Sequence, residues 1–424
     1  MIYNVVIYFV LWGIAIASLF NEKVRKMWRG ERDAFRILRE NVDPTERYIW
    51  FHAASLGEFE QGRPLMERIR RDYPQYKILL TFYSPSGYEV RKNYEGADII
   101  CYMPVDTRLN AIRFLRLVRP VMAFFIKYEF WSNFLHILKY RNIPTYSVSS
   151  IFREDQVFFK WYGRSYANVL KCFTRFFVQN EESKRLLESI GIKDVDVVGD
   201  TRFDRVLQIK QAAKHLPICE AFRSGVAGSD SAASSEKASH PDYKVFVAGS
   251  SWPPDEKIFI RFFNEHKDWR LLIAPHVIAE EHLKLILSLL KDKKVVRYTQ
   301  TTPEEAAKAD VLIIDCFGLL SSMYNYGDVA YIGGGFGVGI HNTLEAAVWN
   351  MPVIFGPNNK KFQEAQGLLK SGGGFEINTY EDFEGLMSSM MNDAAFLKLA
   401  GDKAGAFVAS LSGATGKVLA KVKL

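Results

Sequence analysis

The sequence predicts an α/β protein with two Rossmann-like domains facing each other across a cleft, a GT-B type arrangement, and an N-terminal membrane-anchor helix. Short apolar runs alternate with helical patterns along nearly all of the 424 residues, which is typical of parallel βαβ units. The alternation pauses at a Ser/Ala/Gly-rich segment, residues 224–240, and then restarts. The first twenty residues carry no charged side chain. These three observations predict the fold class.

The uncharged segment, Met1 to Phe20, would form a helix of roughly 30 Å, the thickness of a bilayer's hydrocarbon core. No basic residue precedes it and Glu22 follows it closely, which is unlike a cleavable signal peptide. The cations after it include Lys23, Arg25, Lys26 and Arg29, and the positive-inside rule then places the body of the protein in the cytoplasm. The alternatives are a buried helix or one lying in the membrane interface. We expect deletion of residues 1–20 to leave transfer to a detergent-dispersed acceptor largely intact.

Composition is that of a folded enzyme. Hydrophobic residues make up 48% and charged residues 24% of the chain, which excludes wholesale disorder. The net charge of +7 favours anionic partners. The four cysteines show no C-x-x-C spacing, and no cluster of carboxylates, His or Cys predicts a metal or another cofactor.

The apolar runs give twelve predicted strands and a division into domains. Residues 1–22 form the anchor, 23–215 the first domain, 216–242 a flexible linker or insertion, 243–400 the second domain, and 401–424 C-terminal helices that pack back toward the first domain. Ligands of open α/β sheets bind at the carboxyl ends of strands, so residues after each strand are the candidates for chemistry. The predicted strands are 47–53, 77–83, 99–103, 121–126, 145–149, 175–179, 245–248, 271–274, 295–298, 311–315, 329–332 and 353–355.

Three strand ends in the first half carry candidate residues. The first is followed by Ser55, Gly57 and Glu58, where a carboxylate near the positive end of a helix can act as a general base. A capping box between Ser55 and Glu58 explains the same spacing equally well. The second strand is followed by a small-residue turn with Ser86 and Gly87, and the fourth by Lys127 to Asn133.

The glycine-rich segment Tyr331 to Glu345 is the richest site of the second half. Its glycines let the backbone approach a phosphate closely, and His341 and Asn342 are predicted to open a helix that carries Glu345 on the same face. Glu345 is then placed to accept both hydroxyls of a ribose. A dinucleotide fingerprint fails on context, because no acid follows at the usual offset. The segment Gly413 to Lys417 lacks the strand and the full pattern of a nucleoside-triphosphate loop.

Eight ordered motifs resemble the bacterial 3-deoxy-D-manno-octulosonic acid (Kdo) transferase family, which moves Kdo from CMP-Kdo to a lipid A precursor. With the anchor, the resemblance covers most of the chain. The motifs are HAASLGE (52–58), TFYSPSG (81–87), YEFWSN (128–133), QNEESKRLLESIG (179–191), GDTRFD (199–204), GSSWPPDE (249–256), GGGFGVGIHNTLE (333–345) and FGPNNKKF (355–362).

The resemblance implies an inverting transfer in lipopolysaccharide synthesis, in which Glu58 is the general base that deprotonates the acceptor hydroxyl. It implies a CMP-Kdo donor, a phosphorylated glycolipid acceptor (lipid IVA) and attachment to the inner membrane, with no nucleic acid as partner. Lys127, Ser132, Leu319 and the missing Arg at Pro275-His276 depart from the family's pattern. The implied donor contacts are Ser250, Ser251, His276, Gly334, Gly335, His341, Asn342 and Glu345, and the implied acceptor side comprises Ser55, Gly57, Ser86, Gly87, Glu129 and Arg202.

Three rival functions remain open at this point. One is another envelope glycosyltransferase that uses a UDP-sugar, and a second is a catalytically inactive membrane-tethered binding protein of the same fold. The third is a nucleic-acid binder, but the basic residues cluster after the anchor instead of interleaving with aromatic residues.

Overall fold

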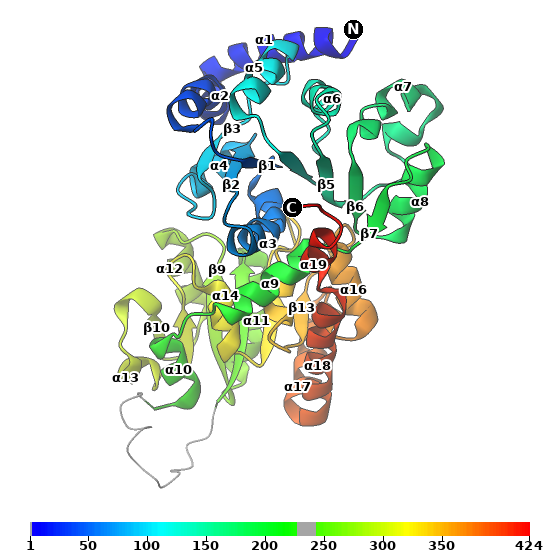
Figure 1. Cartoon of the computed structure of the whole chain (residues 1–424). Coiled ribbons are helices and arrows are strands. Elements are labelled where there is room, and N and C mark those ends of the chain that lie inside the picture. Colours follow the sequence, from blue (N-terminus) through cyan, green and yellow to red (C-terminus); the bar gives the residue numbers. More distant parts are fainter. Residues whose placement is uncertain (1, 227–242) are drawn as a thin grey trace. The chain divides into compact units, whose positions relative to one another are not determined.

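The computed structural model describes residues 2–226 and 243–424, which form two compact units (Figure 1). The first unit comprises Met1–Arg205 and Ser412–Leu424, and the second comprises Val206–Leu411. Each unit is built on one parallel sheet of seven strands covered by helices. The predicted class of two Rossmann-like α/β domains is confirmed.

The first sheet has the order β3-β2-β1-β4-β5-β6-β7, so β1 and β4 are neighbours although two strands and their helices separate them in sequence. The strands are β1 (Tyr48–Ala53), β2 (Lys77–Phe82), β3 (Ile99–Tyr102), β4 (Met122–Ile126), β5 (Thr145–Ser150), β6 (Arg175–Val178) and β7 (Val195–Val197). The helices are α1 (Ile2–Phe20), α2 (Glu22–Asn41), α3 (Leu56–Asp72), α4 (Pro85–Arg91), α5 (Arg108–Val118), α6 (Ser132–Tyr140), α7 (Arg164–Ala167), α8 (Glu181–Ser189), α9 (Thr201–Gln211), which runs on into the second unit, and α19 (Ala414–Leu419), with short 3-10 turns at Val157–Phe159, Trp161–Gly163 and Leu170–Cys172.

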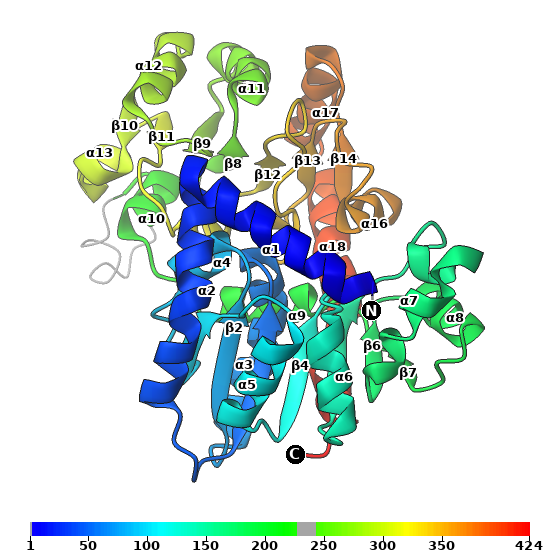
Figure 2. The same ribbon diagram turned by 90° about the horizontal axis from the view of Figure 1, so that it is seen from above.

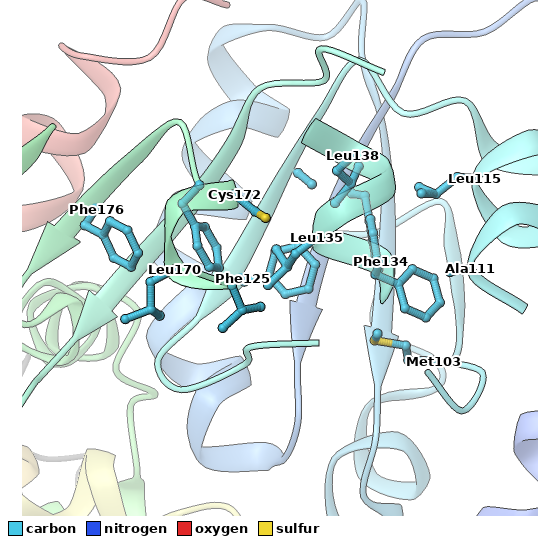
Figure 3. Close-up of a cluster of buried hydrophobic side chains, with 14 of the residues drawn as sticks. Met103, Ala111, Leu115, Phe125, Phe134, Leu135, Leu138, Leu170, Cys172 and Phe176 are labelled. Atoms are coloured by element: carbon cyan, nitrogen blue, oxygen red, sulfur yellow. The ribbon is translucent and has the colours of Figure 1, made fainter. Parts of the chain in front are cut away.

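The alternation of side chains along β1 divides the core of this unit into two layers. Trp50 points into a cluster with α2, α5 and α6, whereas Phe51 points into one with α3 and α19. Figure 3 shows how Phe134, Leu135 and Leu138 of α6 enter the first cluster. Both layers end at the carboxyl edge of the sheet, where the predicted site residues lie.

The second sheet has the order β10-β11-β9-β8-β12-β13-β14. Its core packs α11, α12 and α17 against the sheet, with Phe246 and Tyr331 at the centre. The strands are β8 (Lys244–Ser251), β9 (Trp269–Pro275), β10 (Val295–Arg297), β11 (Val311–Ile313), β12 (Val329–Ile332), β13 (Val353–Phe355) and β14 (Gly374–Glu376). The helices are α10 (Pro217–Ser224), α11 (Pro253–Glu265), α12 (Glu280–Leu289), α13 (Pro303–Ala306), α14 (Leu320–Met323), α15 (Leu344–Ala347), α16 (Gln363–Ser371), α17 (Tyr380–Asn392) and α18 (Ala394–Leu411), with short 3-10 turns at Tyr298–Gln300 and Tyr324–Tyr326.

The structure differs from the expected domain organisation at two places. The predicted linker, 216–242, begins with a helix, α10, in which Cys219 and Phe222 are buried; residues 227–242 lie outside the described residues. The expected boundary at residue 401 falls inside α18, which belongs to the second unit. Within the 401–424 segment, Ser412–Leu424 belongs to the first unit and buries apolar side chains of α19 there.

Helix α1 is the one candidate membrane span among the described residues. Its window Tyr3–Phe20 has a mean hydropathy of 1.9, and only 6% of that window is buried. Length and composition allow it to cross a membrane. Its largely exposed apolar side chains are Val5, Val6, Tyr8, Phe9, Val10, Trp12, Ile16, Leu19 and Phe20.

Glu31 on α2 is a buried carboxylic acid whose two oxygens have no hydrogen-bond partner in the part of the chain that the structure describes. Burial raises the pKa of Glu31 to about 8. A folded-state pKa above the unfolded one means that the folded protein binds the extra proton. The stability that this proton contributes is present at low pH and is lost as the pH rises through the folded pKa.

We expect the free energy of unfolding of the wild type, relative to Glu31→Gln, to fall by about 1.4 kcal/mol per pH unit between about pH 5 and about pH 8. Gln has a similar shape but no titrating proton, so other titrating groups cancel in the difference. Denaturant unfolding of both proteins across this range measures it. A difference that does not change with pH would contradict the burial of an ionisable Glu31.

Candidate active site

Three neighbouring strands of the first sheet, β2, β1 and β4, end at the same edge with the three polar motifs predicted from the sequence. The register pairs His52 of β1 with Thr81 of β2 and with Phe125 of β4. Because the strands are parallel, the segments that follow them meet at that edge.

Glu58 lies in the first turn of α3, half-buried. The hydroxyl of Ser55 donates a hydrogen bond to the Glu58 carboxylate. Ser55 is the N-cap residue, but its side chain accepts no capping hydrogen bond, and no reciprocal capping box forms. The capping-box alternative is therefore wrong for this helix, and the Glu58 side chain lies at the positive end of α3.

Glu129 lies beside His52 and Trp131. Its Oε2 atom is 3.1 Å from His52 Nε2 and accepts a 2.6 Å hydrogen bond from Trp131 Nε1. On the other side of the imidazole, Nδ1 lies 2.9 Å from the hydroxyl of Thr81, which itself accepts a hydrogen bond from Trp50. The Thr81 hydroxyl also donates to the Phe51 carbonyl at 3.3 Å, and Trp131 Nε1 also lies 3.1 Å from His52 Nε2.

His52, Thr81 and Trp131 are site residues that the sequence did not single out. His52 and Thr81 are fully buried, whereas the Glu129 side chain keeps 14% of its surface exposed. Lys127, between β4 and Glu129, has a left-handed backbone with φ of 63°, which is unusual for a residue with a side chain and turns the chain sharply after the strand. In the sequence, these site residues could have been indicated by His52, a polar residue that follows Phe51 in a predicted buried strand.

Gly87, Ser86, Gly57 and Arg202 are the remaining predicted acceptor residues. Gly87 packs against the turn of Ser55, since a Cβ atom there would lie 3.1 Å from the Ser55 carbonyl carbon and 2.3 Å from the Phe82 ring. Ser86 bonds Ser84, and Gly57 is exposed.

Arg202 lies on α9. Its guanidinium donates to Asp200 at 2.8 Å, and Asp200 also accepts from Gln61 of α3. Through Asp200, Arg202 is therefore connected to α3, the helix that carries Glu58.

In the second unit, the glycine segment is held against the end of β8 by backbone contacts. A Cβ atom on Gly333 would lie 2.2 Å from the Ser250 carbonyl oxygen, and one on Gly335 would lie 2.5 Å from the Gly356 nitrogen. Ser250 and Gly334 have left-handed backbones, with φ of 53° and 92°. Close approach of the two loops therefore requires these glycines.

Asp255 fastens this loop and was not predicted from the sequence. Its buried carboxylate accepts hydrogen bonds from the N–H groups of Gly334 and Trp252, both at 2.9 Å, and from the Tyr331 hydroxyl at 2.8 Å. Burial raises the pKa of Asp255, although these hydrogen bonds oppose the shift. The WPPD sequence, with Asp at the third helical position, was the available signal.

The side chain of Ser251 supports the end of β8 from inside the second unit. Its hydroxyl is fully buried and donates to Glu256 at 2.8 Å. Glu256 also lies 2.9 Å from Nε2 of His282. Its hydroxyl is therefore turned into the interior of the unit, and the predicted donor contact of Ser251 would have to come from its backbone.

The ring of His276 packs on both Trp252 and His341, which are themselves joined by a hydrogen bond. The centroid of His276 lies 4.7 Å from that of Trp252 and 4.4 Å from that of His341, with nearly parallel planes. Trp252 Nε1 donates to His341 Nε2 at 3.1 Å, and burial followed by the neighbouring His276 lowers the pKa of His341. His341 is thus a neutral ring, and exposed His276 offers an aromatic edge to a ligand.

The predicted helix around His341 begins later than expected. Helix α15 starts at Leu344, so His341 and Asn342 precede it and do not share a helical face with Glu345. Asn342 nevertheless reaches Glu345, donating to its carboxylate at 2.9 Å, because its other amide atom accepts from the Leu344 N–H. An Asn turn replaces the predicted first helical turn.

No group of three or more His, Cys, Asp or Glu that could hold a metal ion is found in residues 2–226 and 243–424.

Residues 29–205 match the family model described as 3-Deoxy-D-manno-octulosonic-acid transferase (kdotransferase). The chain is 26% identical over 347 residues to the 3-deoxy-D-manno-octulosonic acid transferase of Aquifex aeolicus, covering 80% of this chain and 84% of that protein. It is 25% identical over 365 residues to the enzyme of the same name from Haemophilus influenzae, covering 82% and 80%.

Solved structures resemble the fold at lower identity. A UDP-N-acetylglucosamine 2-epimerase of Listeria monocytogenes has a TM-score of 0.60 at 11% identity, covering 89% of this chain and 95% of that one. MurG of Acinetobacter baumannii has a TM-score of 0.53 at 11% identity, covering 88% and 98%. At this identity the likeness concerns the fold alone.

The two Rossmann-like domains, together with the sequence relatives, define the chain as a glycosyltransferase. Residues 29–205 match the Kdo transferase family model and relatives of that name cover 80–82% of the chain, so the resemblance drawn from the eight motifs is confirmed.

Proposed function

We propose that this chain transfers Kdo from CMP-Kdo to a phosphorylated glycolipid of the lipid A type, lipid IVA, with inversion at the anomeric carbon and with Glu58 as the general base. The observation that carries the proposal is the state of Glu58. Its carboxylate is not part of a capping box and accepts a hydrogen bond from the Ser55 hydroxyl. It lies at the sheet edge that also carries Glu129. The family of the relatives supplies the donor and the acceptor class.

The proposed step is a single displacement. The acceptor hydroxyl oxygen forms a bond to the anomeric carbon while the bond from that carbon to the phosphate oxygen breaks, and CMP leaves with the electron pair. Glu58 takes the hydroxyl proton. The Ser55 hydroxyl fixes the orientation of the carboxylate, so that little reorganisation accompanies the transfer.

The second unit supplies a plausible donor site for such a step. The glycine segment that Asp255 fastens brings backbone N–H groups close to a ligand phosphate, as expected for Gly334 and Gly335. The exposed edge of the His276 ring is suited to contact a nucleobase, and Glu345 beside Asn342 is suited to accept ribose hydroxyls.

We infer that α1 attaches the first unit to the inner membrane with the catalytic domains on the cytoplasmic side. Its exposed apolar side chains support contact with lipid. The polar groups at its start, however, bond the body of the unit, as described below, which favours a helix lying in the interface over one that spans the bilayer.

Two of the four cations expected to meet the membrane are engaged within the protein. Arg25 is engaged by backbone carbonyls of Ser18 and Leu19, and Lys26 pairs with Glu22. By contrast, a cavity of about 340 Å³ beside Leu11 of α1 is lined by Arg32, Arg39 and Arg113, which have no ion pair within the described residues.

Replacing Arg32, Arg39 and Arg113 by Gln is expected to weaken binding to vesicles with anionic lipid by about 10²-fold, at about 1 kcal/mol per cation. Sedimentation with vesicles at low salt measures it. A matched control replaces Lys417, Lys421 and Lys423. These lysines lie in the C-terminal segment, whose apolar side chains pack in the other core cluster of the same unit. Equal losses in the two variants would show that only net charge matters.

Turnover with radiolabelled CMP-Kdo and a lipid A precursor in detergent tests the proposed function. We expect label in the lipid fraction with CMP-Kdo and none with UDP-sugars. Transfer from a UDP-sugar instead would favour the rival envelope glycosyltransferase, and donor binding without any transfer would favour the inactive binding protein.

A further inference from the structure

The N-terminal end of α1 is hydrogen-bonded to the segment that carries Glu129. The Tyr3 hydroxyl donates to Asp106 at 2.6 Å, and the Asn133 amide donates to the side chain of Asn4 at 2.8 Å. Figures 1 and 2 both show the first turn of α1 near α6. An element expected to be only an anchor thus contacts the catalytic edge of the first unit.

Asp106 is the group through which this contact acts. It is fully buried, and its carboxylate accepts from the backbone N–H groups of Asn133 at 3.0 Å and Phe134 at 3.1 Å. Trp131, the N-cap residue of α6, makes no side-chain cap of its own. Asp106 therefore caps α6 from a distant loop, and Tyr3 shares its carboxylate.

The other side of α6 is fixed by packing. Phe134, Leu135 and Leu138 are fully buried in the core layer that Figure 3 shows. Adjustment is thus confined to the residues before Phe134, and Trp131, which donates to Glu129, is among them. A shift at the start of α6 moves the donor that orients Glu129.

We propose that α1 is a positioning element of the acceptor half of the site: Tyr3 and Asn4 hold the first turn of α6 and thereby the indole of Trp131 and the carboxylate of Glu129. This inference rests on the proposed function for the role of Glu129. Its consequence reverses the expectation from sequence, since removal of α1 impairs transfer even when the acceptor is dispersed and no membrane is needed.

The test compares full-length Tyr3→Phe with Tyr8→Phe in detergent. Tyr8 lies on the same helix, is about half-exposed, and makes no hydrogen bond in the described part of the chain. Loss of one hydrogen bond to a charged group is expected to raise the KM for the acceptor about tenfold in Tyr3→Phe, with the KM for CMP-Kdo unchanged. Amide exchange in residues 129–135 is expected to accelerate in Tyr3→Phe only, and Tyr8→Phe is expected to match the wild type in both measurements.

Deletion of residues 1–20 is the second arm. We expect it to reproduce the acceptor-specific loss at least as strongly. Unchanged acceptor KM and unchanged exchange in both Tyr3→Phe and the deletion would overturn the inference while leaving the proposed function in place. If the wild type transfers no Kdo, the proposed function fails, and amide exchange at residues 129–135 still decides whether Tyr3 positions α6.

Discussion

Glu58→Gln is expected to lower the turnover number by about 10²- to 10⁴-fold, the usual contribution of a positioned general base. Gln keeps the size of the side chain and can still accept a hydrogen bond from Ser55, but it cannot take a proton. The fold and CMP binding should therefore be nearly unchanged. Steady-state kinetics, calorimetric titration with CMP and thermal unfolding measure the three properties.

Glu67→Gln provides the control for this prediction. Glu67 lies on the same helix and pairs with Arg63 at 2.6 Å, on a partly exposed surface. Its loss should change stability slightly and turnover not at all. A Glu58→Gln enzyme that keeps more than roughly a tenth of the wild-type rate would exclude Glu58 as the base.

Gly333→Ala is expected to damage the donor site strongly. The new Cβ atom would lie 2.2 Å from the Ser250 carbonyl oxygen and 2.6 Å from the Ser251 Cα atom, and neither backbone can move without breaking the contacts of Asp255. Overpacking of this kind costs about 1–3 kcal/mol or more. We expect a thermal midpoint lower by several degrees and a raised KM for CMP-Kdo.

Gly337→Ala separates this effect from a general sensitivity of the loop. A Cβ atom on Gly337 meets nothing within 4 Å, and its backbone is not left-handed. The substitution should be nearly neutral in both stability and donor KM. If Gly333→Ala behaves like Gly337→Ala, the close approach of the two loops is not needed for donor binding.

The strands were predictable because buried parallel strands carry continuous apolar runs. All twelve predicted strands are present, within a few residues of their expected bounds. The strands Val195–Val197 and Gly374–Glu376 were missed, because each has three residues and lies at the edge of its sheet, where exposed and polar residues dilute the signal.

The site was predictable only in part. Glu58, Glu129 and the glycine segment follow strands directly, and the position of a residue after a strand can be recognised in the sequence. The contact of His52 with Glu129 joins residues 77 positions apart, and only the register of β1 and β4 creates it. Similarly, the tie between Tyr3 and Asp106 depends on how α1 packs, which hydropathy does not reveal.

The anomeric configuration of the glycolipid product tests the central claim, a single displacement assisted by Glu58, most directly. The purified enzyme is supplied with CMP-Kdo and the lipid A precursor, and the first product formed is analysed by nuclear magnetic resonance before any secondary reaction. One displacement inverts the centre, so the account predicts a Kdo linkage of the configuration opposite to that of the donor. Retention of the donor's configuration would require two displacements and a covalent intermediate, and would contradict the assignment of Glu58 as the base.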